Sequence, residues 1–119
     1  MSAASAHRNA WSIQASLAPS ANLCTLTIAG RIGSAGAAEV RRTCTDAFER
    51  GGRVRLDLEQ VDYISSAGIA LLFEAAQRVH DHGGTLELGR CSEAVRLALR
   101  IAGPIPHLGA SPPDDEGSA

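Results

Sequence analysis

The chain has 119 residues, of which 45% are apolar and 20% are charged, and this is the size and composition of one globular domain. Its basic residues are all arginines scattered along the chain, and the net charge of −2 gives no sign of the basic patch that binds nucleic acid. Aromatic residues make up only 3%, which argues against binding of single strands by base stacking, and no apolar run is long enough to span a bilayer.

The two ends of the chain differ in composition from its middle. Residues 1–10 are mostly small and polar, and residues 111–119 carry two prolines and three acids. We therefore expect flexible tails at 1–10 and 111–119 around a single domain at 11–110. The N-terminus lacks the apolar stretch of a signal peptide, and the three cysteines form no CxxC pair. These features predict a cytoplasmic protein with reduced, buried thiols.

Alternating apolar and polar side chains predict the strands. In chain order, the expected strands are 11–17, 23–28, 53–59 and 85–88. We expect a last short strand near 105–108, at an edge of the sheet because Pro104 and Pro106 lie in or beside it.

Three apolar stripes with helical spacing lie between and after these strands. They run from Val40 to Phe48, from Ile69 to Val79 and from Ala94 to Ile101, and glycines follow each of them. Ser34 and Ser92 precede two of the stripes and are predicted N-caps. The order of elements predicts an α/β fold with a mixed, largely parallel sheet. Because the strands alternate, we expect the helices to pack mainly on one face of that sheet.

The most informative stretch is RVRLDLEQVDYISSAGIALLF at residues 53–73. A strand here passes into a helix at Ser65, Ser66, Ala67 and Gly68. Sites collect at this edge of open α/β sheets, and a helix N-terminus can stabilise a phosphate, including one attached to a serine. Alternatively, Ser65 or Ser66 only caps the helix.

This stretch, followed by HGG at 82–84 and by LELGRCSEAVRLALRIAG at 86–103, resembles the STAS domain. It is especially similar to the stand-alone anti-sigma factor antagonists of bacteria, over roughly residues 11–108. The resemblance implies a mixed sheet with helices on one side. It also implies a binding protein without catalytic residues, cofactor or metal.

The resemblance further implies a phosphorylation switch. Its acceptor serine falls on Ser66, and the partner is an anti-sigma factor that is also a serine kinase. Unphosphorylated antagonist binds this partner and frees the sigma factor; phosphorylation releases the antagonist, and a phosphatase resets it. Two positions depart from the family pattern, because Ser65 and Gly33 stand where aspartate is usual. The acceptor therefore has less negative surroundings.

We expect the partner to cover one edge of the sheet, where the carboxyl ends of the parallel strands meet. Arg31 and Arg90 flank this edge and can steer an acidic partner. Gly68 suggests a close backbone approach, and its enlargement should weaken partner binding more than stability. The predicted partner-binding residues are Gly33, Ser34, Ser65, Ser66, Ala67, Gly68 and Ser92.

Two other functions stay open. The chain can be a constitutive subunit of a larger complex, such as a lipid-transport ABC ATPase, in which Ser66 is never phosphorylated. It can also be a nucleotide-binding sensor, although it has no phosphate-loop motif. The run His80-Asp81-His82 could ligate a metal, but these cations also suit a helix C-terminus. Charges at 53–59 are explained by pairing across strands.

Overall fold

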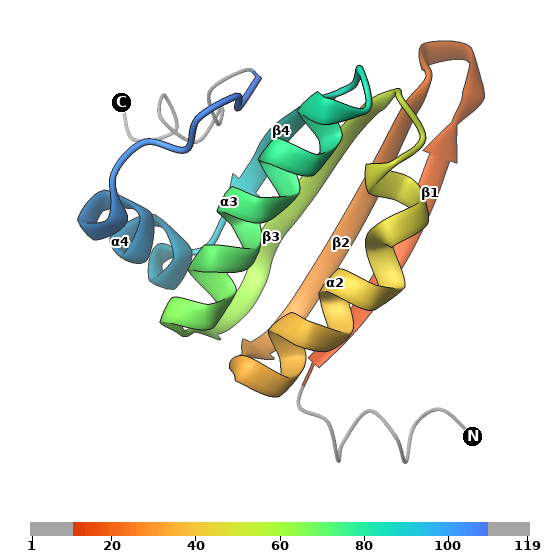
Figure 1. Cartoon of the computed structure of the whole chain (residues 1–119). Coiled ribbons are helices and arrows are strands. Elements are labelled where there is room, and N and C mark those ends of the chain that lie inside the picture. The colour runs from red at the N-terminus through yellow and green to blue at the C-terminus, as the bar shows by residue number, and fades with distance from the viewer. Residues whose placement is uncertain (1–10, 110–119) are drawn as a thin grey trace, which may run out of the picture.

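Strands and helices alternate along the chain in the computed structural model, which describes residues 11–109 (Figure 1). The elements are β1 (Trp11–Ala18), a 3₁₀ turn (Pro19–Ala21), β2 (Leu23–Ile32), α2 (Ser34–Phe48), β3 (Arg53–Ile64), α3 (Ser66–Asp81), β4 (Thr85–Cys91) and α4 (Glu93–Ala102). The tails expected at 1–10 and 111–119 lie outside the described residues. Within residues 11–109, no helix has the length and apolar character needed to cross a membrane.

The strands form one sheet in the order β1-β2-β3-β4. β1 runs antiparallel to β2, whereas β2, β3 and β4 run parallel. Figure 1 shows α2 and α3 side by side across one face of the sheet, and α4 packs against β3 and β4. This confirms the predicted α/β fold. Because β2, β3 and β4 are parallel, α2 and α3 both begin at the edge where β2 and β3 end.

All four strands run past their predicted ends, most of all β2 and β3, which end at Ile32 and Ile64 instead of at residues 28 and 59. β2 and β3 stay paired to their last residues, where Ile32 lies opposite Ile64. Their register shifts between Thr27 and Ala29 and again after Gly30. Such irregularities break the alternation of side chains, so both neighbours Glu59 and Gln60 are exposed. The alternation therefore ends before the strand does.

The strand expected near 105–108 does not form. Leu108 makes a single parallel bridge to Leu86, and the Gly109 N–H donates to the Leu86 carbonyl at 2.6 Å. Pro104 and Pro106 lack the N–H groups that a longer ladder would need. Ile105 is nevertheless buried in the core, so this segment packs against the domain.

Of the two predicted N-caps, Ser92 is confirmed and Ser34 is not. Ser92 caps α4, because its side chain accepts a hydrogen bond from the Val95 N–H at 3.2 Å. The prediction for Ser34 is wrong: this serine is the first residue of α2, and Gly33 is the N-cap without a side-chain bond.

One apolar core fills the space between the sheet and the helices, and the described residues include no buried polar or charged side chain. Cys24, Cys44 and Cys91 are buried thiols in this core, as predicted. Burial, together with the neighbouring Cys24, raises the pKa of Cys44 to about 11. Cys44 therefore keeps its proton at neutral pH and behaves as a small apolar side chain.

Ion pairs cross from β3 to β4, as the charge pattern predicts. Glu87 of β4 pairs with Arg53 at 3.0 Å and with Arg55 at 3.2 Å, and Arg90 pairs with Glu59 at 2.8 Å. These charges satisfy one another at the solvent-facing side of the sheet and need no ligand to explain them.

The raised pKa of Cys44 predicts a loss of stability at alkaline pH. Between the ordinary pKa of 9.0 and the folded value of about 11, the unfolded thiol loses its proton while the folded thiol keeps it. The free energy of unfolding should therefore fall by about 1 kcal/mol between pH 8 and pH 10 through this group. Urea denaturation of wild type and Cys44→Ala measures this effect. The pH-dependent loss should be smaller by that amount in Cys44→Ala, and equal losses would contradict the assignment.

Candidate functional site

The junction between β3 and α3 is held by Ser65. Its backbone N–H donates to the carbonyl of Ile32 at 2.9 Å, which ties the end of β3 to the end of β2. Its side-chain oxygen accepts from the Gly68 N–H at 3.2 Å, which caps α3. Of the two serines that could have capped the helix, Ser65 is the cap.

Ser66 has a different environment, although it is the next residue. It is the first residue of α3 and is exposed, whereas Ser65 is partly buried. Within residues 11–109, no hydrogen bond involves the Ser66 hydroxyl. The hydroxyl is therefore available to solvent or to an enzyme, on the first turn of a helix.

Gly68 lets the first turn of α3 lie directly on the strand ends. It is buried, and a Cβ atom there would lie 2.6 Å from Cγ1 of Ile64 and 3.1 Å from both Cγ2 and the carbonyl oxygen of Ile32. The close approach expected at Gly68 is thus made by the protein's own β2 and β3. A side chain there should therefore cost stability directly.

A second helix begins at the same edge. Gly33 follows β2 as the N-cap of α2, and its carbonyl accepts from the Ala37 N–H at 2.8 Å. Ser34 is exposed at the first position of α2. The first turns of α2 and α3 contain no acid, so the partial positive charges of both helix N-termini are not offset there.

Arg31 and Tyr63 form a pair at this edge that the sequence analysis missed. The guanidinium carbon of Arg31 lies 4.5 Å from the centre of the Tyr63 ring, a cation–π contact. Tyr63 is 41% exposed although it is a large aromatic residue. The register pairs Arg31 with Tyr63, one residue before the Ile32–Ile64 pair. The alternation of side chains could not reveal this pair, because it does not mark the strand ends at Ile32 and Ile64.

The structure places Ser92 away from this group. Its N–H donates to the Leu58 carbonyl at 3.1 Å, and Leu58 lies seven residues before Ser65. At about 3.3 Å per strand residue, Ser92 and Ser65 are separated by on the order of 20 Å along β3. Six of the predicted contact residues lie together at the edge where α2 and α3 begin: Gly33, Ser34, Ser65, Ser66, Ala67 and Gly68. Ser92 and Arg90 lie farther from this edge along the sheet.

The other candidate sites have structural explanations. His80 stacks on His107 with ring centres 4.0 Å apart, and the His82 ring Nδ1 lies 2.9 Å from the Arg78 carbonyl oxygen. No group of metal-ligating side chains occurs among residues 11–109.

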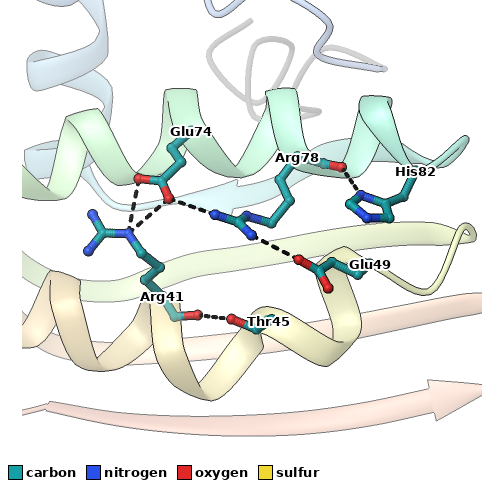
Figure 2. Close-up of polar contacts among 6 residues, drawn as sticks. All are labelled: Arg41, Thr45, Glu49, Glu74, Arg78 and His82. Carbon is teal, nitrogen blue, oxygen red and sulfur yellow. Dashed lines mark hydrogen bonds and ion pairs between the residues drawn. The ribbon is translucent and has the colours of Figure 1, made fainter.

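Charged side chains on the outer surface of α2 and α3 join these two helices (Figure 2). Glu74 of α3 accepts from Arg41 of α2 at 2.9 Å and from Arg78 at 3.2 Å. Arg78 also pairs with Glu49 at 2.8 Å, just past the end of α2. Hydrogen bonds to Glu49 and Glu74 raise the pKa of Arg78. Since these charges pair with one another, the network holds α2 beside α3 and needs no ligand.

A family model described as "Mlab, STAS domain" matches residues 15–104 of the chain. The chain belongs to the STAS domain family. No curated protein matches it.

Solved structures share the fold of this STAS domain. The unphosphorylated anti-sigma factor antagonist SpoIIAA is 16% identical with a TM-score of 0.69, and the match covers 90% of this chain and 92% of SpoIIAA. An anti-sigma factor antagonist from Mycobacterium paratuberculosis is 14% identical with a TM-score of 0.73, and 91% of each chain is covered. At these identities, the likeness shows the fold alone.

The separate environments of the two serines predict separate effects on stability. Ser65→Ala removes the cap of α3 and should lower the free energy of unfolding by about 1 kcal/mol. Ser66→Ala removes an exposed hydroxyl that has no hydrogen-bond partner among the described residues, and it should change the free energy of unfolding by less than about 0.5 kcal/mol. Urea denaturation of both variants tests this, and a larger loss for Ser66→Ala would reverse the assignment.

Gly68 and Gly33 give a matched pair of glycine substitutions. Gly68→Ala forces a methyl group against Ile32 and Ile64 and should cost about 1–3 kcal/mol. A Cβ at Gly33 would meet nothing within 4 Å, and its φ of −91° suits any residue. Gly33→Ala should therefore meet no steric barrier and cost less than Gly68→Ala, at most about 1 kcal/mol through the preference of an N-cap for glycine over alanine. If thermal denaturation finds equal midpoints for the two variants, α3 does not depend on this close approach.

Proposed function

We propose that this STAS domain is an anti-sigma factor antagonist that works by partner switching. Unphosphorylated protein binds an anti-sigma factor with serine kinase activity, phosphorylation of Ser66 releases that partner, and a phosphatase restores binding. The observation that carries this proposal is that two adjacent serines have different environments. The Ser65 side chain caps α3, whereas Ser66 is exposed and its hydroxyl makes no hydrogen bond among the described residues.

The site can accept a phosphate without refolding. A phosphoserine carries about −1.5 to −2 charges and stabilises a helix when it lies at the N-terminus. Ser66 is at that position, and the first turns of α2 and α3 hold no acid to repel it. The free state of the protein should therefore tolerate the modification.

The same charge would act against a bound partner. A phosphate at the centre of a packed contact adds repulsion and a cost of desolvation. A hundredfold loss of affinity needs only about 2.7 kcal/mol, which these terms can supply. Release of the partner thus needs no change in the fold of the antagonist.

The contact surface is the edge where α2 and α3 begin. Gly33, Ser34 and the turn from Ser65 to Gly68 form its centre, and Arg31 stacked on Tyr63 adds an exposed pair of the residue types enriched at binding hot spots. Ser92 would contact a partner only if the interface extends along β3.

The comparisons support the general role. SpoIIAA, an anti-sigma factor antagonist, has solved structures in both its unphosphorylated and its phosphorylated form, with TM-scores of 0.69 and 0.64 to this chain. One fold thus accommodates both states of SpoIIAA. For this chain, the acceptor at Ser66 and the kinase partner are our proposal.

A constitutive interaction subunit, for example of a lipid-transport ABC ATPase, is the second candidate. The description of the matching family model names Mlab and not an anti-sigma factor antagonist. Gly33 and Ser65 also occupy positions where the antagonists usually carry aspartate. In such a subunit, Ser66 would carry no phosphate.

Phosphopeptide mapping of protein purified from its native host separates the two candidates. Trypsin should release residues 56–78 as one peptide that contains Ser65, Ser66 and no other serine. We expect a phosphate on Ser66 in wild type and in Ser65→Ala, and none on this peptide in Ser66→Ala.

Retention of partners tests the switch itself. Ser66→Ala should retain the anti-sigma factor in pull-downs, and Ser66→Asp should lose it. An unphosphorylated peptide in every growth phase, with partners retained equally by Ser66→Ala and Ser66→Asp, would instead favour the constitutive subunit.

A further inference from the structure

The outer edge of β1 is an unprotected sheet edge. Among residues 11–109, β1 pairs only with β2, so one side of Trp11–Ala18 presents backbone N–H and C=O groups without a neighbouring strand from this part of the chain. Sheet edges are usually protected by charges, prolines or bulges. The eight residues WSIQASLA contain no charge and no proline, and their pairing with β2 has no register shift. The edge of β4 differs, because Leu108 and Gly109 pair with Leu86 there.

One side chain on this edge lacks the cover expected for its position. Leu17 lies opposite the buried Cys24 in the β1–β2 register, so it points to the helix-covered face of the sheet. It is nevertheless 53% exposed. Trp11 lies at the other end of the same face, where its ring approaches Gly36 of α2, and it is partly buried. The helix-side face of β1 is thus covered near Trp11 and open near Leu17.

We infer that β1 is a dimerisation edge, which pairs antiparallel with β1 of a second copy about a two-fold axis at Gln14. In this register Trp11 lies opposite Leu17 of the second copy, and Ile13 lies opposite Ala15. All apolar pairs then share the helix-covered face, and each Trp11 ring covers the exposed Leu17 of the other chain. The polar pairs, on the other face, are Ser12 with Ser16 and Gln14 with Gln14.

A second copy fits this edge better than an unrelated charged strand. In an isologous pair a side chain on the two-fold axis meets its own copy, so a charge at the axis would meet a like charge. β1 carries no charge, and its apolar and polar residues alternate in the same order on either side of Gln14. The result would be a continuous eight-stranded sheet with the helices of both copies on one face.

The association should be reversible, because a single strand pair is a small interface compared with those of stable complexes. Sedimentation of the full chain measures it. The weight-average mass should rise from 12.3 kDa toward twice that value as the concentration approaches about 1 mM. A monomer throughout this range would overturn the inference, whether the edge stays open or another segment of the chain covers it.

Two substitutions at Gln14 locate the interface. Gln14 is exposed, so the fold should tolerate both changes. Gln14→Lys places two ammonium groups opposite each other and should weaken association about tenfold, whereas Ser20→Lys adds the same charge outside the paired segment and should not. Gln14→Cys brings two thiols within the range of disulfide formation and should give a covalent dimer with oxidised glutathione; Ser20→Cys should not.

A dimer that is unaffected by Gln14→Lys and that Gln14→Cys does not cross-link would overturn the inference. In that case another exposed apolar surface, such as Leu97 and Ile101 on α4, would be the interface. Phosphorylation of Ser66 is not needed for any of these outcomes, so the dimer and the proposed switch can fail independently.

Discussion

The candidate site depends on the close packing of the first turn of α3 against the ends of two strands. Gly68 makes this possible, since a Cβ atom would collide with Ile64 and crowd Ile32. The helix can therefore begin immediately after β3, and the Ser65 N–H reaches the Ile32 carbonyl. With Ser65 fixed as the cap, Ser66 is the first helical residue and faces solvent. The position of the proposed acceptor is thus set by a residue that has no side chain.

The parallel arrangement of β2 and β3 adds the second helix start to this edge. α2 begins at Ser34 and α3 at Ser66, each directly after its strand, and neither first turn carries an acid. The Arg41–Glu74 ion pair joins α2 to α3, and Arg78 of α3 pairs with Glu49 just past the end of α2 (Figure 2). An exposed serine at a helix N-terminus whose first turn holds no acid is a suitable place to add and remove a phosphate.

Much of the fold could be predicted from alternation and helical stripes, because one face of the sheet is buried and the other is not. The ends of β2 and β3 could not, since register shifts put Glu59 and Gln60 both in solvent and hide the continuation of β3 to Ile64. The cap could not be assigned either, because two adjacent serines satisfy the same sequence rule and only the backbone conformation separates them. The strand predicted near Leu108 was reduced to one bridge by flanking prolines that cannot donate hydrogen bonds.

Hydrogen exchange of the chain alone and in complex with the partner that co-purifies from its host tests the account most directly. Binding at the edge where α2 and α3 begin should slow exchange at residues 31–34 and 64–70, and leave the opposite edge at 51–53 and 82–85 unchanged. Protection at 51–53 and 82–85, with none at 31–34 and 64–70, would contradict it.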